Sequence, residues 1–206
     1  RLFLDALLRG QYPADLLHHF TGLFPEAHEG DLETISEPMD FLGINYYTRA
    51  VVRYAQNSLP LQAELVYPEG NEYSQMWEIY PQGLYDLLIR LHVDYRDAPL
   101  CPVDWYITEN GVPVPDGVDF DGRVRDERRI RFLRRHLRAL HRAIQAGVPI
   151  RGYFHWSLLD NFEWAYGYRM RFGLIYVDWE TQQRIIKDSG RFYAEVIRRN
   201  ALEIAE

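Results

Sequence analysis

Three short apolar segments, each followed by a loop and a helical pattern, constrain the fold of this chain most strongly. Residues 40–48, 105–108 and 150–156 are rich in aromatic and β-branched side chains, which favour strands. The first segment is nearly continuously apolar, as are strands that are covered on both faces. A repeated strand–loop–helix unit predicts an α/β fold with a parallel sheet and helices outside it.

The helical pattern after each strand candidate has its own boundary signals. Pro81 suits the first turn of one helix, Asp126 is a plausible N-cap of the next, and Asp188 can cap the last. Gly147 is expected to end the second helix. The expected core positions of the three helices are Leu84, Leu87, Leu88 and Leu91, then Ile130, Leu133, Leu137, Leu140 and Ile144, then Phe192, Val196, Ile197 and Leu202.

A long segment without a periodic pattern separates the first strand from its helix. Residues 50–76 contain Pro60, Pro68 and Gly70, and they are predicted to form an irregular excursion. Loops of this length inside a compact domain are usually functional or mobile.

Two features indicate a larger fold than this chain can complete alone. Three parallel strands cannot close a barrel, and as an open sheet they would leave two long edges. Leu4, Leu7 and Leu8 already follow helical spacing at the start of the chain, and Gly10 closes that helix. We therefore expect a chain that begins inside a helix and forms a piece of something longer.

Charge and cysteine content exclude several classes of function. The net charge is -7, so a chain-wide role in binding nucleic acid or an anionic membrane is not expected. Residues 126–147 are rich in arginine. The favoured interpretation is the solvated outer face of a helix, and the alternative is a surface that binds nucleic acid. No run of 18 apolar residues predicts a transmembrane helix. The single Cys101 excludes an intrachain disulfide and fits a reducing compartment, the cytoplasm.

Glu109 is the first candidate functional residue, because it ends the second strand candidate. A carboxylate is out of place inside a buried strand, but the carboxyl end of a strand is where α/β barrels expose catalytic groups. The alternative is a strand-to-turn junction with a solvated acid. Asn110-Gly111 is a common turn signal, and both residues tolerate a positive φ.

The other two strand candidates also carry polar groups near their carboxyl ends. Asn45 and Tyr47 close the first one, where the alternative is a tyrosine-rich edge strand that runs into a loop. His155 lies in the third. No acid or second histidine is nearby in sequence, so a core histidine is favoured over a ligand or a base.

Five motifs resemble glycoside hydrolase family 1, the β-glucosidases and their relatives. They are residues 41–47, 77–81, 107–111, 156–164 and 172–178. Each motif alone is weak to moderate evidence, but together and in the family's order they are specific. The resemblance covers almost the whole chain.

This resemblance implies a (β/α)8 TIM barrel, to which the chain supplies roughly strands 6 to 8 and their helices. Residues 1–206 would form the C-terminal part of one glycosidase domain. The family hydrolyses β-glycosides with retention, and Glu109 resembles its nucleophile. Tyr47 resembles the tyrosine that donates to that carboxylate, and Asn45 resembles its polar neighbour.

The resemblance also implies the sugar-binding residues. Trp156, Glu163, Trp164 and Phe172 resemble the wall that holds the sugar, since an indole face suits a pyranose and a carboxylate suits adjacent hydroxyls. Trp77 resembles the residue that lines the leaving-group side. Glu163 would repel a phosphate, so unphosphorylated β-D-glucosides, galactosides or fucosides are expected. In each case the alternative is a buried aromatic or a rim acid.

The family's acid/base glutamate has no counterpart here. It lies in a Thr-x-Asn-Glu-Pro motif, which this sequence lacks; Glu37-Pro38 precedes the first strand candidate and lacks the Asn. The expected partners are a β-glycoside substrate and the N-terminal half of the same barrel, in the same chain or as a second chain. The alternative is a non-catalytic sugar-binding or vestigial half-barrel module. No metal or other cofactor is implied.

Overall fold

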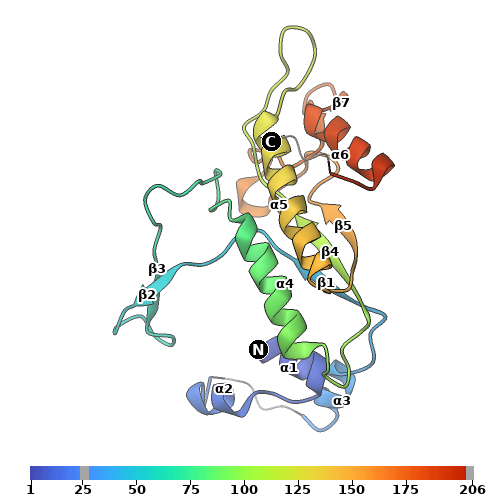
Figure 1. Cartoon of the computed structure of the whole chain (residues 1–206). Helices are drawn as coiled ribbons and strands as arrows, with labels where there is room; N and C mark the ends of the chain where they lie inside the picture. Colours follow the sequence, from blue (N-terminus) through green and yellow to red (C-terminus); the bar gives the residue numbers. More distant parts are fainter. Residues whose placement is uncertain (24–27, 203–206) are drawn as a thin grey trace.

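A parallel three-stranded sheet forms the centre of the computed structural model, which describes residues 1–23 and 28–202. Strands β1 (Phe41–Asn45), β4 (Asp104–Asn110) and β5 (Ile150–His155) follow one another in that order (Figure 1). The predicted parallel sheet is therefore confirmed. Near the carboxyl ends the register shifts, so that Asn45 lies opposite Glu109 and Asn110 opposite His155.

Two long helices cover one face of this sheet. Helices α4 (Pro81–Tyr95) and α5 (Glu127–Gln145) lie side by side in front of the strands in Figure 1. Their buried side chains meet the inward-facing residues of the strands in one core, where fully burying an aliphatic or aromatic side chain stabilises the fold by about 1.5–3 kcal/mol. That core includes Leu42, Ile44, Leu84, Leu88, Leu91, Trp105, Ile107, Leu140 and Ala143.

The opposite face of the sheet is open, which corrects the expectation that the first strand is covered on both faces. Strand β1 alternates between exposed and buried residues. Phe41 is 49% exposed, and Phe154 of β5 is 56% exposed. Within residues 1–23 and 28–202 the long helices pack on one side of the strands, so the apolar residues of the other side face outward.

The ends of the chain form smaller elements around the sheet. Helix α1 (Leu2–Arg9) ends at Gly10, which has a φ of 66°, as predicted. The next two helices are short, and a 3-10 turn and a β-hairpin precede the last helix. These elements are α2 (Ala14–His19), α3 (Asp31–Ile35), η1 (Trp164–Tyr166), β6 (Ile175–Val177), β7 (Arg184–Ile186) and α6 (Asp188–Arg199).

The long excursion is not wholly irregular. Strands β2 (Val52–Tyr54) and β3 (Ala63–Leu65) form an antiparallel hairpin that projects from the body of the molecule (Figure 1). The residues of β2 are all exposed. A strand without a buried face leaves no alternation of apolar and polar residues, which explains why the sequence pattern did not predict it.

Helix boundaries differ in detail from the sequence expectations. Asp126 occupies the N-cap position of α5, but its side chain makes no capping hydrogen bond. Asp188 is the first residue of α6, and Lys187 precedes it as N-cap. Two expected core residues lie outward instead: Ile144 is 43% exposed and Ile197 is 62% exposed.

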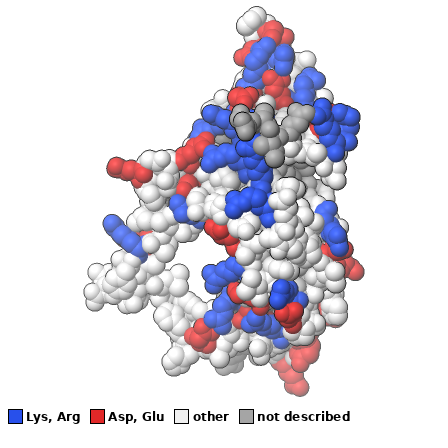
Figure 2. Space-filling model, viewed as in Figure 1, with Lys and Arg blue, Asp and Glu red and all other residues white. Residues whose placement is uncertain are grey.

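The arginine-rich helix α5 has a mixed surface. Figure 2 shows positively charged side chains gathered over α5 with acidic side chains beside them. Arg135 pairs with Glu72 at 2.5 Å, and Arg142 donates to Gln82 at 3.1 Å. Arg129 does not belong to this outer face, because it is fully buried.

The helices in the described part of the chain are too short or too polar to cross a lipid bilayer.

Candidate active site

Glu109 lies at the carboxyl end of β4, partly buried beside the end of β1. The hydroxyl of Tyr47 donates a hydrogen bond to Glu109 Oε2 at 2.6 Å. The pairing of β1 with β4 brings these two residues together, because the register places Asn45 opposite Glu109 and Tyr47 follows two residues later. The structure therefore joins the two residues that the sequence separates by 62 positions.

The environment keeps Tyr47 in its protonated form. Burial raises the pKa of the Tyr47 hydroxyl far above its ordinary value of 10, and the hydrogen bond to Glu109 and its negative charge raise that pKa further. A phenol that keeps its proton is the donor in this pair, and the carboxylate is the acceptor. Hydrogen bonds to a carboxylate are among the stronger ones in proteins.

Asn45 lies at the same level of the sheet but has a different partner. Its side-chain oxygen accepts a hydrogen bond from Thr108 Oγ1 at 2.6 Å. Asn45 is exposed on the open face. Thr108, which precedes Glu109, was not singled out from sequence.

Asn110 is a supporting residue that sequence reasoning misjudged. It lies inside β4, fully buried, and not in a left-handed turn. Its side chain donates to Tyr46 O at 2.7 Å and accepts from Tyr153 Oη at 2.7 Å. Asn110 thus ties the end of β4 to the residue that follows β1 and to β5, directly beside Glu109.

Gly111 marks a close approach between the two loops of the site. A Cβ atom on Gly111 would lie 1.9 Å from Trp156 O. The glycine is therefore required by the neighbouring backbone, and not by a positive φ as the turn signal indicated. The loops after β4 and β5 touch at this point.

Trp156 and Glu163 form a pair in the loop that follows β5. The indole of Trp156 hydrogen-bonds the Glu163 carboxylate. Burial raises the pKa of Glu163, the negative charge of Glu109 raises it further, and the Trp156 hydrogen bond opposes both. The two carboxylates are therefore close enough to influence each other.

The remaining aromatic candidates occupy different environments. Trp77 packs between the rings of Tyr47 and Phe172, with centroid distances of 5.1 and 5.9 Å. Phe172 is almost completely buried, and its ring packs against Trp77. Trp164 is 83% exposed at the start of η1.

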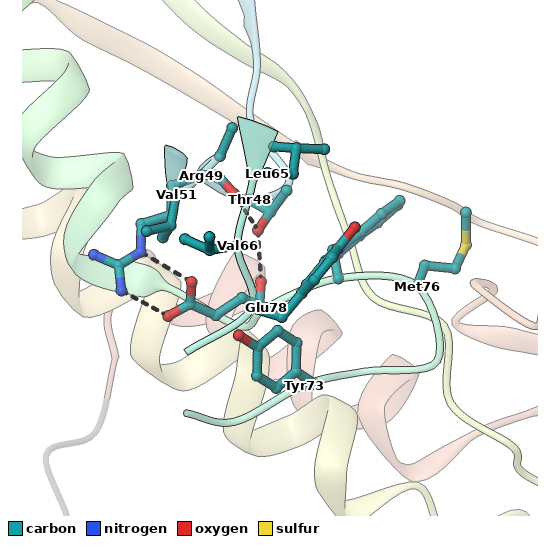
Figure 3. Close-up of a pocket in the computed structure, with 11 residues that line it drawn as sticks. Thr48, Arg49, Val51, Leu65, Val66, Tyr73, Met76 and Glu78 are labelled. Atoms are coloured by element: carbon teal, nitrogen blue, oxygen red, sulfur yellow. Dashed lines mark hydrogen bonds and ion pairs between the residues drawn. The ribbon is translucent and has the colours of Figure 1, made fainter. Parts of the chain in front are cut away.

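An apolar cavity of about 270 Å³ lies beside Trp77 (Figure 3). Its lining comes from both sides of the excursion, with Val51 before the hairpin tip and Leu65 and Met76 after it. At one end the carboxylate of Glu78 accepts two hydrogen bonds from Arg49, both at 2.9 Å.

His155 is held neutral in the interior. Its Nε2 lies 3.3 Å from Phe172 O, and its Nδ1 is buried without a hydrogen-bond partner in the described structure. Burial lowers the pKa of His155 to about 3, and the charge of Arg129 lowers it further. The expected core histidine is therefore found, with one of its nitrogens satisfied.

Within residues 1–23 and 28–202, no group of three or more His, Cys, Asp or Glu side chains is arranged to hold a metal ion.

Comparison with known proteins places these features in context. The family model for glycosyl hydrolase family 1 matches residues 1–202. The 1,4-beta-D-glucan glucohydrolase of Thermotoga neapolitana is 46% identical over 201 residues, which are 98% of this chain and 44% of that protein. A bifunctional beta-D-glucosidase/beta-D-fucosidase of Bifidobacterium breve is 42% identical over 215 residues, covering 96% of this chain and 46% of that protein.

Solved structures agree with this result. The family 1 β-glucosidase from Thermotoga maritima superposes with a TM-score of 0.89 at 43% identity, over 98% of this chain and 44% of that chain. These solved relatives are TIM barrels, and the chain matches part of such a barrel. The chain spans less than half the length of the relatives that it matches.

Proposed function

The chain belongs to glycosyl hydrolase family 1, and from that premise we propose that it forms the part of a retaining β-glycosidase that carries the nucleophile, Glu109. The observation that carries this proposal is the hydrogen bond of 2.6 Å from Tyr47 to Glu109 at the carboxyl end of β4. This hydrogen bond orients the Glu109 carboxylate at the place where barrel enzymes hold their reacting groups.

The proposed reaction has two displacements. Glu109 attacks the anomeric carbon while the bond to the leaving-group oxygen breaks, and a second carboxylic acid protonates that oxygen. A covalent glycosyl ester of Glu109 results. Water, deprotonated by the second carboxylate, then attacks the same carbon and releases Glu109, so the sugar keeps its configuration. The two carboxyl groups of a retaining site lie about 5–5.5 Å apart.

The second carboxylate is proposed to come from the N-terminal half of the same barrel, in the same chain or as a second chain. Two observations support this. The chain covers 44% of its β-glucosidase relatives, and the sheet is open on the face that carries Phe41 and Phe154. Strands that complete the barrel would cover that face.

The proposed substrates are terminal, unphosphorylated β-D-glucosides, galactosides or fucosides. Trp156 offers an indole face to the sugar, and Glu163 is proposed to hold the sugar's 4- and 6-hydroxyls with its carboxylate, as the family resemblance implies. Trp164 is proposed to complete this wall when the barrel is whole, and Asn45 to contribute a polar group near Glu109. A phosphorylated sugar would meet the negative charge of Glu163.

The leaving group is proposed to pass Trp77. This ring separates Tyr47 from the apolar cavity of about 270 Å³. Phe172 is proposed to act indirectly, by packing against Trp77, because its own ring is buried. The free Cys101 is compatible with the proposed location in the cytoplasm.

The test needs a whole barrel. We define the completed barrel as this chain fused to the portion of Thermotoga maritima beta-glucosidase A that it does not cover. Hydrolysis of 4-nitrophenyl β-D-glucoside is expected. Glu109→Ala should abolish turnover, and azide should restore it with an α-glucosyl azide as product, because the small anion enters the space of the lost carboxylate.

Glu180→Ala, which removes an exposed acid, is the matched control and should keep full activity. Undiminished turnover by Glu109→Ala would refute the nucleophile assignment. A completed barrel that binds glucose but never hydrolyses the glucoside would favour the sugar-binding module instead.

A further inference from the structure

Six ionised side chains are buried together between the two loops of the candidate site and the start of α6. Their charges cancel, with three cations and three anions. The side chains of Arg129 and Lys187 are completely buried. The members of this cluster, which we call the ionic network, are Asp116, Asp126, Arg129, Asp160, Arg171 and Lys187.

Lys187 is the link between the two loops. Its Nζ lies 2.9 Å from Asp116 Oδ2 and 2.8 Å from Asp160 Oδ1. Asp116 belongs to the loop that follows Glu109 and β4. Asp160 belongs to the loop that follows β5, between Trp156 and Glu163. One ammonium group therefore connects the loop of the nucleophile to the loop of the sugar-binding wall.

Asp160 organises the wall itself. It is 3% exposed. Besides Lys187, its carboxylate accepts from Gly173 N at 2.9 Å and from Arg171 Nη1 at 2.6 Å. A Cβ atom on Gly173 would lie 2.1 Å from Asp160 N. The segment that leads to Glu163 is thus locked against the segment that carries Phe172.

Stability alone is a weak explanation for such a network. Removing six charges from water is costly, and apolar side chains of similar volume often stabilise a fold as well or better. Directed ion pairs, in contrast, fix the relative position of the groups that they join. An error of about 1 Å in the position of a substrate-binding group can cost on the order of 10²-fold in rate.

We propose that the Asp116–Lys187–Asp160 link is a positioning device that sets Glu163 and Trp156 relative to Glu109, and thereby sets the selectivity for the sugar's 6-hydroxyl. This inference rests on the proposed function of Glu109 and Glu163. None of the three linking residues touches the substrate; they act through the two loops.

The test compares kcat/KM of the completed barrel for 4-nitrophenyl β-D-glucoside and for its 6-deoxy analogue. The ratio of these two values does not depend on the fraction of folded enzyme. Asp160→Asn should lower the ratio by roughly tenfold or more, toward the ratio of Glu163→Gln. With its oxygen at the Oδ1 position, the asparagine can still accept from Gly173 N and from Lys187, but the negative charge that holds Lys187 is lost, and the NH2 group at the Oδ2 position cannot accept from Arg171.

Asp126→Asn is the matched control, because it removes one negative charge from the same network. Asp126 hydrogen-bonds Arg129 in α5 and Ser189 in α6, so it does not connect the two loops to each other. The kcat/KM ratio of Asp126→Asn should stay within about twofold of the ratio of the unsubstituted enzyme. Arg171→Lys keeps the charge but removes Nη1, which donates to both Asp160 and Val177 O. It therefore loosens Asp160, the wall end of the link, and serves if Asp160→Asn does not fold. The proposal is overturned if the ratio of the two kcat/KM values is the same in the unsubstituted enzyme, in Arg171→Lys and in Asp160→Asn, where the last variant folds.

A second readout needs no turnover. In the completed barrel labelled with 5-fluorotryptophan, the fluorine resonance of Trp156 is assigned with Trp156→Phe. Asp160→Asn or Arg171→Lys should move this resonance, while Asp126→Asn should leave it in place. An unmoved resonance in both variants contradicts positioning. An inactive unsubstituted barrel in which the resonance does move would contradict the proposed function and leave the positioning device supported.

Discussion

Replacing Tyr47 by phenylalanine tests how the hydrogen bond to Glu109 is used during the reaction. The bond is short, at 2.6 Å, and its donor is half-buried. When Glu109 attacks the sugar its negative charge is consumed, so the donor loses a partner. When the glycosyl ester breaks down the charge returns, and the donor stabilises it. The second step therefore depends on Tyr47 more than the first step does.

The magnitude follows from the charge on the acceptor. A hydrogen bond to a charged group contributes about 1.5–3 kcal/mol, which corresponds to roughly 10- to 150-fold in rate. Tyr47→Phe should slow the breakdown of the glycosyl-enzyme by that factor and slow its formation less. The intermediate should then accumulate with an activated substrate.

Stopped-flow measurements with 2,4-dinitrophenyl β-D-glucoside on the completed barrel provide the assay. Tyr47→Phe should show a burst of dinitrophenol followed by a slow steady state. Tyr46→Phe is the matched control, since the Tyr46 hydroxyl donates over the same 2.6 Å to Tyr80 O, away from Glu109. An unchanged kcat in Tyr47→Phe, or an equal loss in both steps without a burst, would refute the reasoning.

Two further predictions concern the support of the site in the completed barrel. Gly111→Ala should strongly lower the midpoint of urea unfolding, because the new Cβ would lie 1.9 Å from Trp156 O. Gly117→Ala is the control and should leave the midpoint unchanged, because its Cβ would meet nothing within 4 Å. Equal midpoints in the two variants would contradict the close approach. Burial lowers the pKa of His155 from 6.5 to about 3, so its neutral form contributes stability that is complete above pH 6.5 and is lost as the pH falls toward 3. His155→Gln should therefore reduce the protons taken up on unfolding near pH 5 by about one, and an unchanged uptake would show that His155 is not held neutral.

The three strands of the central sheet could be predicted from sequence because their signals are local. Aromatic and β-branched residues mark 105–108, and the acid at 109 stands where the apolar run stops. The helix after Pro81 is equally local, since its apolar residues recur at helical spacing. The pairing of Tyr47 with Glu109 followed from the family resemblance, and the strand register accounts for it physically.

The supporting contacts could not be predicted, because their partners are distant in sequence. Asn110 reads as a turn residue, yet it bonds Tyr46 and Tyr153, which lie 64 and 43 positions away. Asp126 reads as a helix cap, yet its carboxylate bonds Ser189, 63 positions away. Local propensity describes each residue's neighbours along the chain and carries no information on these tertiary partners.

One-sided burial of the sheet was missed for a related reason. An apolar run such as 40–48 indicates covered faces, but it does not state which polypeptide covers them. Within the described structure Phe41 and Phe154 point outward, and the chain spans less than half the length of its relatives.

Covalent trapping tests the central claim most directly. The completed barrel is incubated with 2,4-dinitrophenyl 2-deoxy-2-fluoro-β-D-glucoside, whose fluorine slows both steps while the activated leaving group lets the first proceed. The enzyme is then digested, and the labelled peptide is sequenced by mass spectrometry. We expect one fluoroglucosyl group, attached to Glu109. A label on any other residue, or an active enzyme that acquires no label, would contradict the assignment of Glu109 as the nucleophile.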